Sequence, residues 1–202
     1  GTAMNLEALL RADRSYRGFS QTERLTDDQL RHLVALTRLT PSTTNLQALK
    51  FFISSGTETN AVIQSRTRWA GRAKEAHLPH PGCEPTAFIV ILLDTKLAPN
   101  ETPFYKDVGI TAQTILLGAT EMGFGGCMIG SFSAEELARA LALPEGLKPL
   151  LVVALGKPAE TVVLHDAPAG YVDEGHYYSR DENDVHHVWK RPLEEILVEA
   201  KK

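Results

Sequence analysis

This chain has few cysteines, no long apolar run and no recognisable leader pattern. Its 202 residues include only two cysteines, Cys83 and Cys127, which excludes the disulfide framework of a small secreted domain. No apolar run approaches the roughly 18 residues that a membrane-spanning helix needs. The start has neither the basic nor the apolar part of a secretory signal, and residues 1–3, ahead of Met4, resemble a cloning remnant. We therefore expect a cytoplasmic protein without a membrane segment.

A surplus of basic charge is also absent. The chain has 21 lysine and arginine residues against 25 acidic residues and a formal net charge of −4, which argues against nucleic-acid binding. Hydrophobic content of 43% and charged content of 23% are ordinary for a globular protein. Because no internal repeat or linker divides the sequence, we expect a single domain over residues 1–202.

What the sequence does contain is a mixture of helical and strand patterns. Apolar spacing, capping boxes and prolines predict helices at 5–12, from 27 to just before Pro41, at 58–76, at 106–122, after Ser133 and after Pro192. Apolar runs predict strands at 51–55, 87–93, 127–132, 150–155 and 185–189. Residues 77–85 are rich in proline and predict a loop, and 156–184 are polar and irregular. Without regular alternation of strand and helix, the order predicts an α+β fold.

The predicted helix at 106–122 has no polar face in its middle. Residues 110–120 are apolar or small all round, so this helix is buried in a core or against a partner chain. For a domain of this size the partner chain is the attractive explanation. The long tail after the last core strand is also suited to reach across a homodimer.

Residues 14–17 are a candidate phosphate site. Two guanidinium groups and two hydroxyls lie within four residues: Arg14, Ser15, Tyr16 and Arg17. Guanidinium groups bind phosphate in a bidentate manner, and a neighbouring hydroxyl adds a hydrogen bond. The alternative is a solvated basic turn.

Residues 41–47 are a candidate site for the edge of a planar ring. The segment combines short polar side chains with amides: Pro41, Ser42, Thr43, Thr44, Asn45 and Gln47. Asparagine and glutamine both donate and accept hydrogen bonds, as a heterocycle edge requires. The alternative is that these residues form turns or cap the next segment.

Two further segments are candidates for the same ligand. The glycines at 123–130 do not match a dinucleotide fingerprint, because their spacing is wrong and they follow a helix. They predict a tight turn into a strand whose Met128, Ile129 and Gly130 lie against a flat ligand. Lys190 and Arg191 form either a surface basic pair or a second phosphate contact from the tail.

Metal and hydrolase sites find little support in the sequence. His77, His80 and Cys83 have ligand-like spacing, but a fourth ligand at suitable spacing is missing. His186 and His187 are neighbours on a predicted strand and point to opposite faces. No GxSxG nucleophile elbow occurs. We therefore expect no metal and no classical catalytic side chain.

Taken in order, these segments resemble the nitroreductase family of FMN-dependent oxidoreductases. The resemblance rests on five features in the family's order: Arg14-Ser15-Tyr16-Arg17, Pro41 to Gln47, Asp107 to Met122, Gly123 to Gly130, and Leu150 to Pro158. It implies a central mixed or antiparallel sheet flanked by helices, in an intertwined homodimer with an extended C-terminal tail. It also implies two FMN sites at the subunit interface, each built from both chains.

The resemblance also implies a function. Electrons pass from NADH or NADPH through flavin N5 to a small acceptor such as a nitroaromatic or a quinone, in ping-pong order. The phosphate would bind Arg14, Ser15 and Arg17, residues 42–45 would border one side of the flavin, and 128–130 the other. Alternatives are a flavin-binding sensor without turnover, or a specialised reductive branch of the family.

The chain departs from the family's pattern at two places. Asp13 stands where many members have a second arginine, so Lys190 or Arg191 would have to supply that cation. Ala48 and Leu49 follow Gln47 where many members have Pro-Trp. The electron acceptor, the choice of NADH or NADPH and the role of the 77–85 loop stay open.

Overall fold

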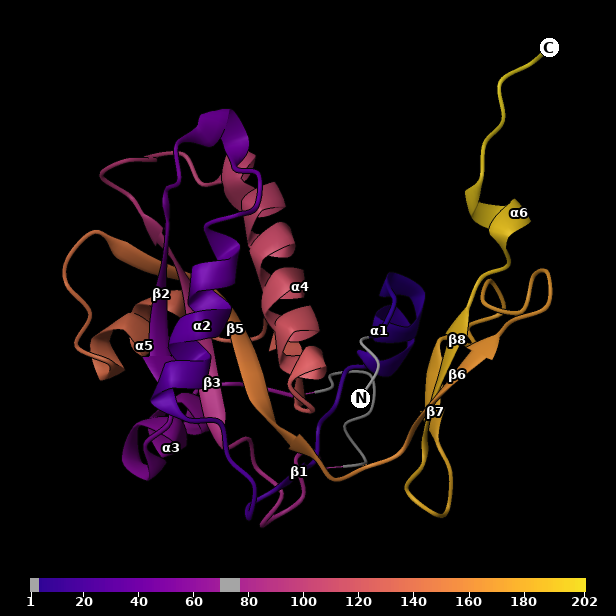
Figure 1. The fold of residues 1–202 in the computed structure, drawn as a ribbon, viewed down its shortest axis with the longest axis horizontal. Helices are drawn as coiled ribbons and strands as arrows, with labels where there is room; N and C mark the ends of the chain where they lie inside the picture. Colours follow the sequence, from indigo (N-terminus) through magenta and orange to yellow (C-terminus); the bar gives the residue numbers. More distant parts are fainter. Residues whose placement is uncertain (1–3, 70–76) are drawn as a thin grey trace. The chain divides into compact units, whose positions relative to one another are not determined.

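The structure is a computed structural model that describes residues 4–69 and 77–202. The chain divides into two compact units, Gly1–Ala159 and Glu160–Lys202. The first unit contains a five-stranded antiparallel sheet: β1 (Phe19–Ser20), β2 (Leu49–Ser54), β3 (Ala87–Asp94), β4 (Gly125–Ile129) and β5 (Leu147–Pro158). The long strand β5 joins the sheet together, because it pairs with β3 on one side and with β4 and β1 on the other (Figure 1). The predicted α+β class is confirmed.

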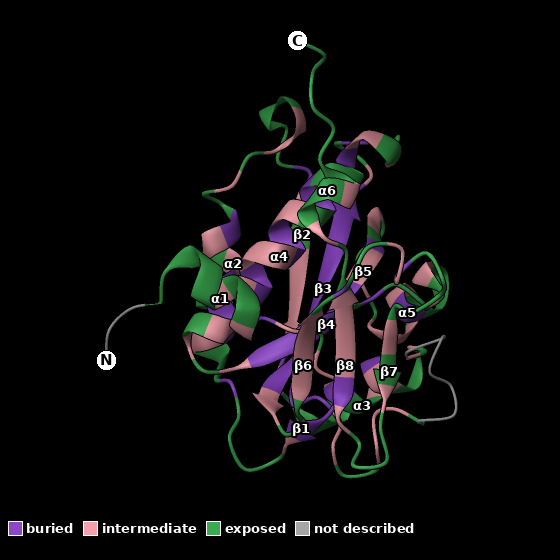
Figure 2. Ribbon diagram, turned by 90° about the vertical axis from the view of Figure 1, so that its right-hand side faces the viewer, coloured by how far each residue is buried: buried purple, intermediate pink, exposed green. Residues whose placement is uncertain are grey.

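Helices cover both faces of this sheet. They are α1 (Leu6–Ala12), α2 (Asp27–Thr37), α3 (Thr57–Ser65), α4 (Tyr105–Glu121) and α5 (Ala134–Ala140), with short 3-10 turns η1 (Thr43–Asn45) and η3 (Thr102–Phe104). Every residue of β3 is buried, as the sequence predicts for a central strand, whereas α1 buries none of its residues (Figure 2). The fold therefore has a core layer on each side of β3.

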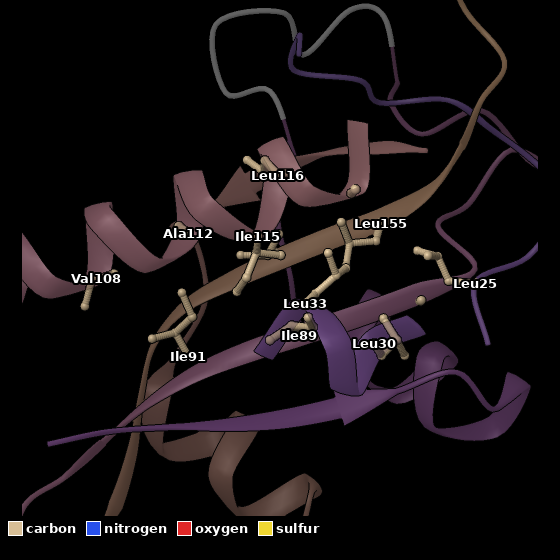
Figure 3. Close-up of a cluster of buried hydrophobic side chains, with 13 residues drawn as sticks. Leu25, Leu30, Leu33, Ile89, Ile91, Val108, Ala112, Ile115, Leu116 and Leu155 are labelled. Atoms are coloured by element: carbon tan, nitrogen blue, oxygen red, sulfur yellow. The ribbon is translucent and has the colours of Figure 1, made fainter. Parts of the chain in front are cut away.

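The alternation of side chains along β3 separates the two core layers. Ile89 and Ile91 pack with Ile115 of α4 and Leu33 of α2 on one face (Figure 3). Phe88 and Val90 face the opposite way, toward residues of α3 and α5. Because successive strand residues point to opposite faces, one fully apolar strand supplies both layers.

Helix α4 is apolar chiefly because it packs inside its own chain. Ala112, Ile115 and Ala119 are fully buried. A Cβ on Gly118 would lie 2.8 Å from the Leu33 side chain, so the glycine allows α4 and α2 to approach closely. Much of the apolar surface that the sequence assigns to a partner chain is thus used by the monomer core.

Several predicted boundaries are wrong. The helix predicted at 58–76 ends at Ser65, and its last part, 70–76, lies outside the described residues. It ends because Thr67 forms a β-bridge with Phe132 and the Arg68 amide donates to the Ser131 carbonyl at 2.9 Å. The strand predicted at 127–132 runs from Gly125 to Ile129, whereas the helix predicted to stop before Pro41 does so, at Thr37.

The second unit is a small sheet that the sequence analysis largely missed. It comprises β6 (Val162–Asp166), β7 (Tyr178–Arg180) and β8 (His186–Lys190), followed by the single-turn helix α6 (Leu193–Ile196). Strand β8 pairs in parallel with β6 and antiparallel with β7. The predicted irregular segment therefore contains two strands, which a buried ion pair helps to hold: Arg180 Nη2 lies 2.7 Å from Glu160 Oε2. The strand at 186–190 was expected.

Among the described residues, no helix has both the length and the apolar character to cross a membrane.

Candidate functional site

A buried carboxylate organises the loop at 41–47. Asp107, in the first turn of α4, is only 2% exposed. The Ser42 hydroxyl donates to its Oδ2 at 2.6 Å, while the Thr43 amide and hydroxyl donate to its Oδ1 at 3.0 and 2.7 Å. The Ser42 oxygen also accepts the Gln47 amide at 3.1 Å, which closes the loop. The loop is therefore fastened to the N-terminal end of α4 (Figure 1).

The charge state of Asp107 follows from these contacts. Burial would raise the pKa of this carboxyl, but hydrogen bonds from Ser42 and Thr43, helped by the charge of Lys106, hold the pKa below its usual value. The position in the first turn adds a favourable interaction with the helix dipole. Asp107 is therefore an ionised anchor at neutral pH.

The fastened loop has an unusual backbone. Thr44, Asn45 and Gln47 have φ values of 53°, 54° and 56°, in a region that non-glycine residues seldom occupy. The same loop borders an open pocket of about 490 Å³. Its lining combines apolar residues with cations: Val34, Thr37, Arg38, Thr40, Pro41, Ser42, Gln47, Leu49, Lys50, Phe51, Asp107 and Thr111. Ser42 and Gln47 thus lie at a cavity, as a ring-binding role requires.

The Arg14–Arg17 segment is held against β4. The Tyr16 amide donates to the Gly126 carbonyl at 3.0 Å, and Ser15 and Gly126 form an isolated parallel bridge. A Cβ on Gly125 would lie 2.8 Å from the Tyr16 ring, and one on Gly126 would lie 1.9 Å from the Ala154 carbonyl oxygen. The glycines are therefore needed for close approach of three backbone segments.

Asp13 joins the same segment to α4. Its buried side chain accepts a hydrogen bond from Gln113 Nε2 at 2.9 Å. Burial raises the pKa of Asp13, and the Gln113 hydrogen bond and the Arg14 charge oppose that shift only in part. Arg14 itself donates from Nε to the Asp13 carbonyl at 2.9 Å and from Nη2 to the Leu10 carbonyl at 3.1 Å. Asp13 thus replaces the expected cation with a structural anchor.

The residues predicted on β4 differ in their exposure. Met128 is 41% exposed, whereas Ile129 is 5% exposed and packs in the core layer beside Phe88. A Cβ on Gly130 would meet no atom within 4 Å. Met128 and Gly130 can therefore border a ligand, while Ile129 can offer only its backbone.

The two basic tail residues have different surroundings within the second unit. Arg191 Nη1 lies 2.6 Å from Asp173 Oδ1 and 3.4 Å from Glu195 Oε1. These carboxylates raise the pKa of Arg191. Lys190 is exposed and, in the part of the chain that the structure describes, forms no ion pair. Of these two residues, Lys190 can therefore bind an anion more readily than Arg191.

The structure does not bring all predicted site residues around one cavity of one chain. The loop at 41–47 contacts α4 at Asp107, whereas the Arg14–Arg17 segment is linked to Gln113, six residues and about 9 Å further along the helix axis. None of the residues 14–17 lines the pocket beside the loop. The two candidate segments are therefore separate surfaces that are linked to α4 at different levels.

These surfaces can be compared with those of known proteins. The sequence profile of the nitroreductase family matches residues 10–157, a range that includes Asp13, both candidate surfaces and the strand β4. The chain belongs to the nitroreductase family. The family match ends two residues before the boundary of the first unit, so the small sheet at 160–202 lies outside it.

Solved structures of the family have the same fold. A nitroreductase family protein of Clostridium difficile 630 is 16% identical with a TM-score of 0.68, and the match covers 98% of this chain and 100% of that one. An FMN-dependent nitroreductase of Clostridium difficile R20291 is 22% identical with a TM-score of 0.62, and the match covers 77% of this chain and 88% of that one. The predicted nitroreductase-like fold is confirmed.

Curated relatives match over shorter ranges. A Cr(VI) reductase of Pseudomonas sp. strain G-1 is 29% identical over 121 residues, 48% of this chain and 49% of the relative. A protein of Methanothermobacter thermautotrophicus, provisionally named as an NADH dehydrogenase or NAD(P)H nitroreductase, is 30% identical over 82 residues, 39% of this chain and 43% of the relative. The chain thus spans about half the length of these relatives, or less.

Sequence reasoning did not assign Asp107 and Gln113 to the site. The sequence contains a sign of the role of Asp107, because it is an acidic residue at the start of an otherwise apolar helix. A carboxylate buried there needs hydrogen-bond partners. The sequence contains no such sign for Gln113, since its role depends on a contact with Asp13 100 residues away in the chain. Asp107 fastens the loop at 41–47, and Gln113 fastens Asp13 beside the Arg14–Arg17 segment.

Proposed function

We propose that the chain is an FMN-dependent oxidoreductase that transfers electrons from NADH or NADPH to a small acceptor such as a nitroaromatic or a quinone. The observation that carries the proposal is the backbone link between Tyr16 and Gly126. It holds the cationic segment directly beside strand β4, which carries Met128 and is followed by Gly130. A phosphate and a flat ring attached to it need such neighbouring surfaces.

The residues present fit an FMN molecule. Arg14 keeps its Nη1 group without a partner among the described residues, and Ser15 is exposed beside it. These groups and the Arg17 guanidinium are the donors that a phosphate dianion prefers. The loop at 41–47 adds amides and hydroxyls in a strained backbone that is held rigid by Asp107. The donor set therefore suits both the phosphate and the polar edge of the ring.

In this proposal the protein's work is binding and positioning. Bound FMN supplies the two-electron chemistry of the reaction. Arg14, Ser15 and Arg17 hold the phosphate, while residues 42–45 and Gln47 border the ring and Met128 and Gly130 cover its other side. Asp107 keeps the loop in place during turnover. No side chain of the chain needs to form a covalent bond with substrate.

A homodimer completes the proposed site. The two surfaces lie at different levels of α4 and do not enclose one cavity, so a second copy is the natural source of the missing wall. The exposed Leu6 and Leu10 of α1 give that copy an apolar surface to cover. Each of the two sites would then take residues from both chains.

The experiment is reconstitution of the purified protein with FMN, followed by addition of NADH or NADPH and then a quinone or nitroaromatic. We expect about one FMN per chain, bleaching of its absorbance by one donor and recovery with the acceptor. Bound FMN that no donor reduces would make the chain a flavin-binding sensor instead. Failure to bind FMN at all would refute the proposal.

Variants locate the phosphate. Arg14→Ala and Arg17→Ala should each weaken FMN binding by about 10-fold to 100-fold, because charge-assisted hydrogen bonds are worth roughly 1.5–3 kcal/mol. Arg11→Ala is the matched control, since Arg11 is an exposed cation nearby that pairs with Glu7, at 3.7 Å. Equal FMN affinity in all three variants would show that the phosphate binds elsewhere.

A further inference from the structure

Two imidazole rings face each other in the second unit. Strands β6 and β8 are parallel and place Val163 opposite His187 and His165 opposite Trp189. His165 Nε2 and His187 Nδ1 are 2.7 Å apart, and the rings are 5.0 Å apart between centroids. The sequence analysis missed this pair because it assigned His165 to an irregular segment. Neither histidine is among the residues assigned to FMN above.

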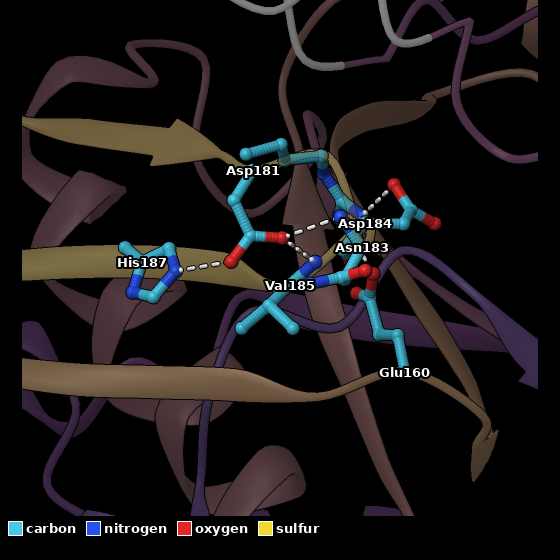
Figure 4. Close-up of polar contacts among 7 residues, drawn as sticks. Glu160, Asp181, Asn183, Asp184, Val185 and His187 are labelled. Atoms are coloured by element: carbon cyan, nitrogen blue, oxygen red, sulfur yellow. Dashed lines mark hydrogen bonds and ion pairs between the residues drawn. The ribbon is translucent and has the colours of Figure 1, made fainter.

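A carboxylate fixes the orientation of His187. Asp181 Oδ2 lies 2.9 Å from His187 Nε2, as Figure 4 shows. The other Asp181 oxygen accepts the amides of Asn183 and Val185 at 2.8 and 3.0 Å, which fixes the carboxylate. Because the carboxylate accepts the Nε2 proton of His187, the Nδ1 lone pair points at His165. This is the arrangement by which carboxylates orient metal-binding histidines in proteins.

We propose that His165 Nε2 and His187 Nδ1 together bind one divalent first-row transition-metal ion, Cu²⁺ in preference to the others. Imidazole suits such ions, and Cu²⁺ binds most tightly along the series. On binding, His165 changes tautomer: its Nε2 proton passes to solvent and its Nδ1 takes up a proton, so that both facing nitrogens of neutral imidazoles present lone pairs to the metal. Within the described residues no group of three or more histidine, cysteine or acidic side chains gathers around a metal position, so solvent fills the remaining coordination positions.

The distance between the nitrogens favours this choice of metal. With metal–nitrogen bonds of about 2.0–2.1 Å, neighbouring ligands in a square-planar site are about 2.9 Å apart, whereas tetrahedral ligands are about 3.3 Å apart. The observed 2.7 Å needs a smaller change in the nitrogen–nitrogen distance to reach the square-planar value, and each ring must also turn so that its lone pair points at the metal. Square-planar geometry is typical of Cu²⁺ and Ni²⁺, and tetrahedral geometry of Zn²⁺. Zn²⁺ should therefore bind more weakly at this pair.

Trp189 provides a local readout. Its ring stacks on His165 with centroids 4.2 Å apart. The chain has two tryptophans, so Trp69→Phe leaves Trp189 as the only one. In that background, addition of Cu²⁺ alone should quench the fluorescence with one equivalent per chain, and EDTA should restore it.

Variants and a matched control make the test specific. His165→Gln and His187→Gln should each weaken Cu²⁺ binding at least 10-fold, and Asp181→Asn by about 10-fold as an orienting residue. His176→Gln is the control, because His176 is a half-exposed imidazole of the same unit that stacks on Tyr171. Unchanged quenching in the His165 and His187 variants, or equal loss in the control, would overturn the proposal.

Wild-type protein provides a test that needs no folded variant. Substoichiometric Cu²⁺ should broaden the ring NMR signals of His165 and His187 before those of His176. Broadening of other histidines first, or none at a large excess of Cu²⁺, would overturn the site. Neither result depends on FMN binding or on electron transfer, so the metal proposal and the proposed function can fail separately.

Discussion

Removal of the Asp107 carboxylate should loosen the loop at 41–47 and destabilise the whole first unit. Asp107→Ala removes three hydrogen bonds to the carboxylate, from the Ser42 hydroxyl, the Thr43 amide and the Thr43 hydroxyl, although the Thr43 hydroxyl retains the Pro103 carbonyl as an acceptor at 3.1 Å. Asp107→Asn keeps one carboxamide oxygen for the Thr43 donors, and its NH₂ group can donate to the Ser42 hydroxyl, but the negative charge is lost. The alanine variant should therefore be the less stable of the two if the loop admits little water.

The magnitude follows from the number and type of bonds. A hydrogen bond to a charged group contributes about 1.5–3 kcal/mol, so three bonds set an upper range of about 4.5–9 kcal/mol. The actual loss of stability is smaller for two reasons. Water can hydrogen-bond to the half-exposed loop, and the variant no longer bears the free-energy cost of burying the Asp107 charge. We expect losses of about 3–4 kcal/mol for Asp107→Ala and about 1–2 kcal/mol for Asp107→Asn.

Urea unfolding at pH 7 measures these losses. With a slope of about 2 kcal/mol per M, the alanine variant should unfold at a urea concentration about 1.5–2 M lower. Because hydrogen bonds hold the pKa of Asp107 below its unfolded value, its contribution is fully present above about pH 4 and is lost as the pH falls through the folded pKa. Glu121→Gln, an exposed carboxylate on the same helix, should change stability by less than about 0.5 kcal/mol. An equally small change in Asp107→Ala would refute the anchor role.

Three other substitutions test the fold. Asp13→Asn keeps an acceptor for Gln113 and removes a buried charge, so it should stabilise the protein at pH 7. Because the pKa of Asp13 is raised in the folded protein, this gain in stability should shrink as the pH falls through the folded pKa. Urea unfolding at several pH values measures the change. Gly126→Ala should cost at least about 3 kcal/mol, since its Cβ would lie 1.9 Å from the Ala154 oxygen, and thermal unfolding checks this. Ile91→Ala, at a fully buried position, should cost about 3–4 kcal/mol in urea unfolding, and a loss below about 1 kcal/mol would contradict the packing of β3.

Local patterns predicted the elements of the first unit well. The apolar run at β3 and the capping box before α2, in which Thr26 and Gln29 bond each other's backbone, identify these elements without tertiary information. Boundaries failed where a distant segment intervened. Thr67 leaves the helix because Phe132 pairs with it, and nothing within residues 58–69 signals that pairing.

The second unit was harder to read for a related reason. Strands β6 and β7 are short and half-exposed, and their sequences lack the alternation that marks a strand at a large core. Two particular contacts stabilise these strands. Strand β6 pairs in parallel with β8, and Arg180 of β7 forms a buried ion pair with Glu160. Such contacts join residues across the sequence, so composition alone does not reveal them.

The departure at Asp13 has a physical explanation in helix α4. The family resemblance leads one to expect a cation at this position, yet the carboxylate is buried and bonded to Gln113. The same helix holds the ring-side loop through Asp107. The chain therefore has one fewer cation near the proposed phosphate site, but both proposed surfaces are fixed to one rigid element packed into the core. A substitution that shifts α4, such as a cavity at Ile115, should consequently disturb both surfaces together, whereas Arg17→Ala should affect the phosphate side alone.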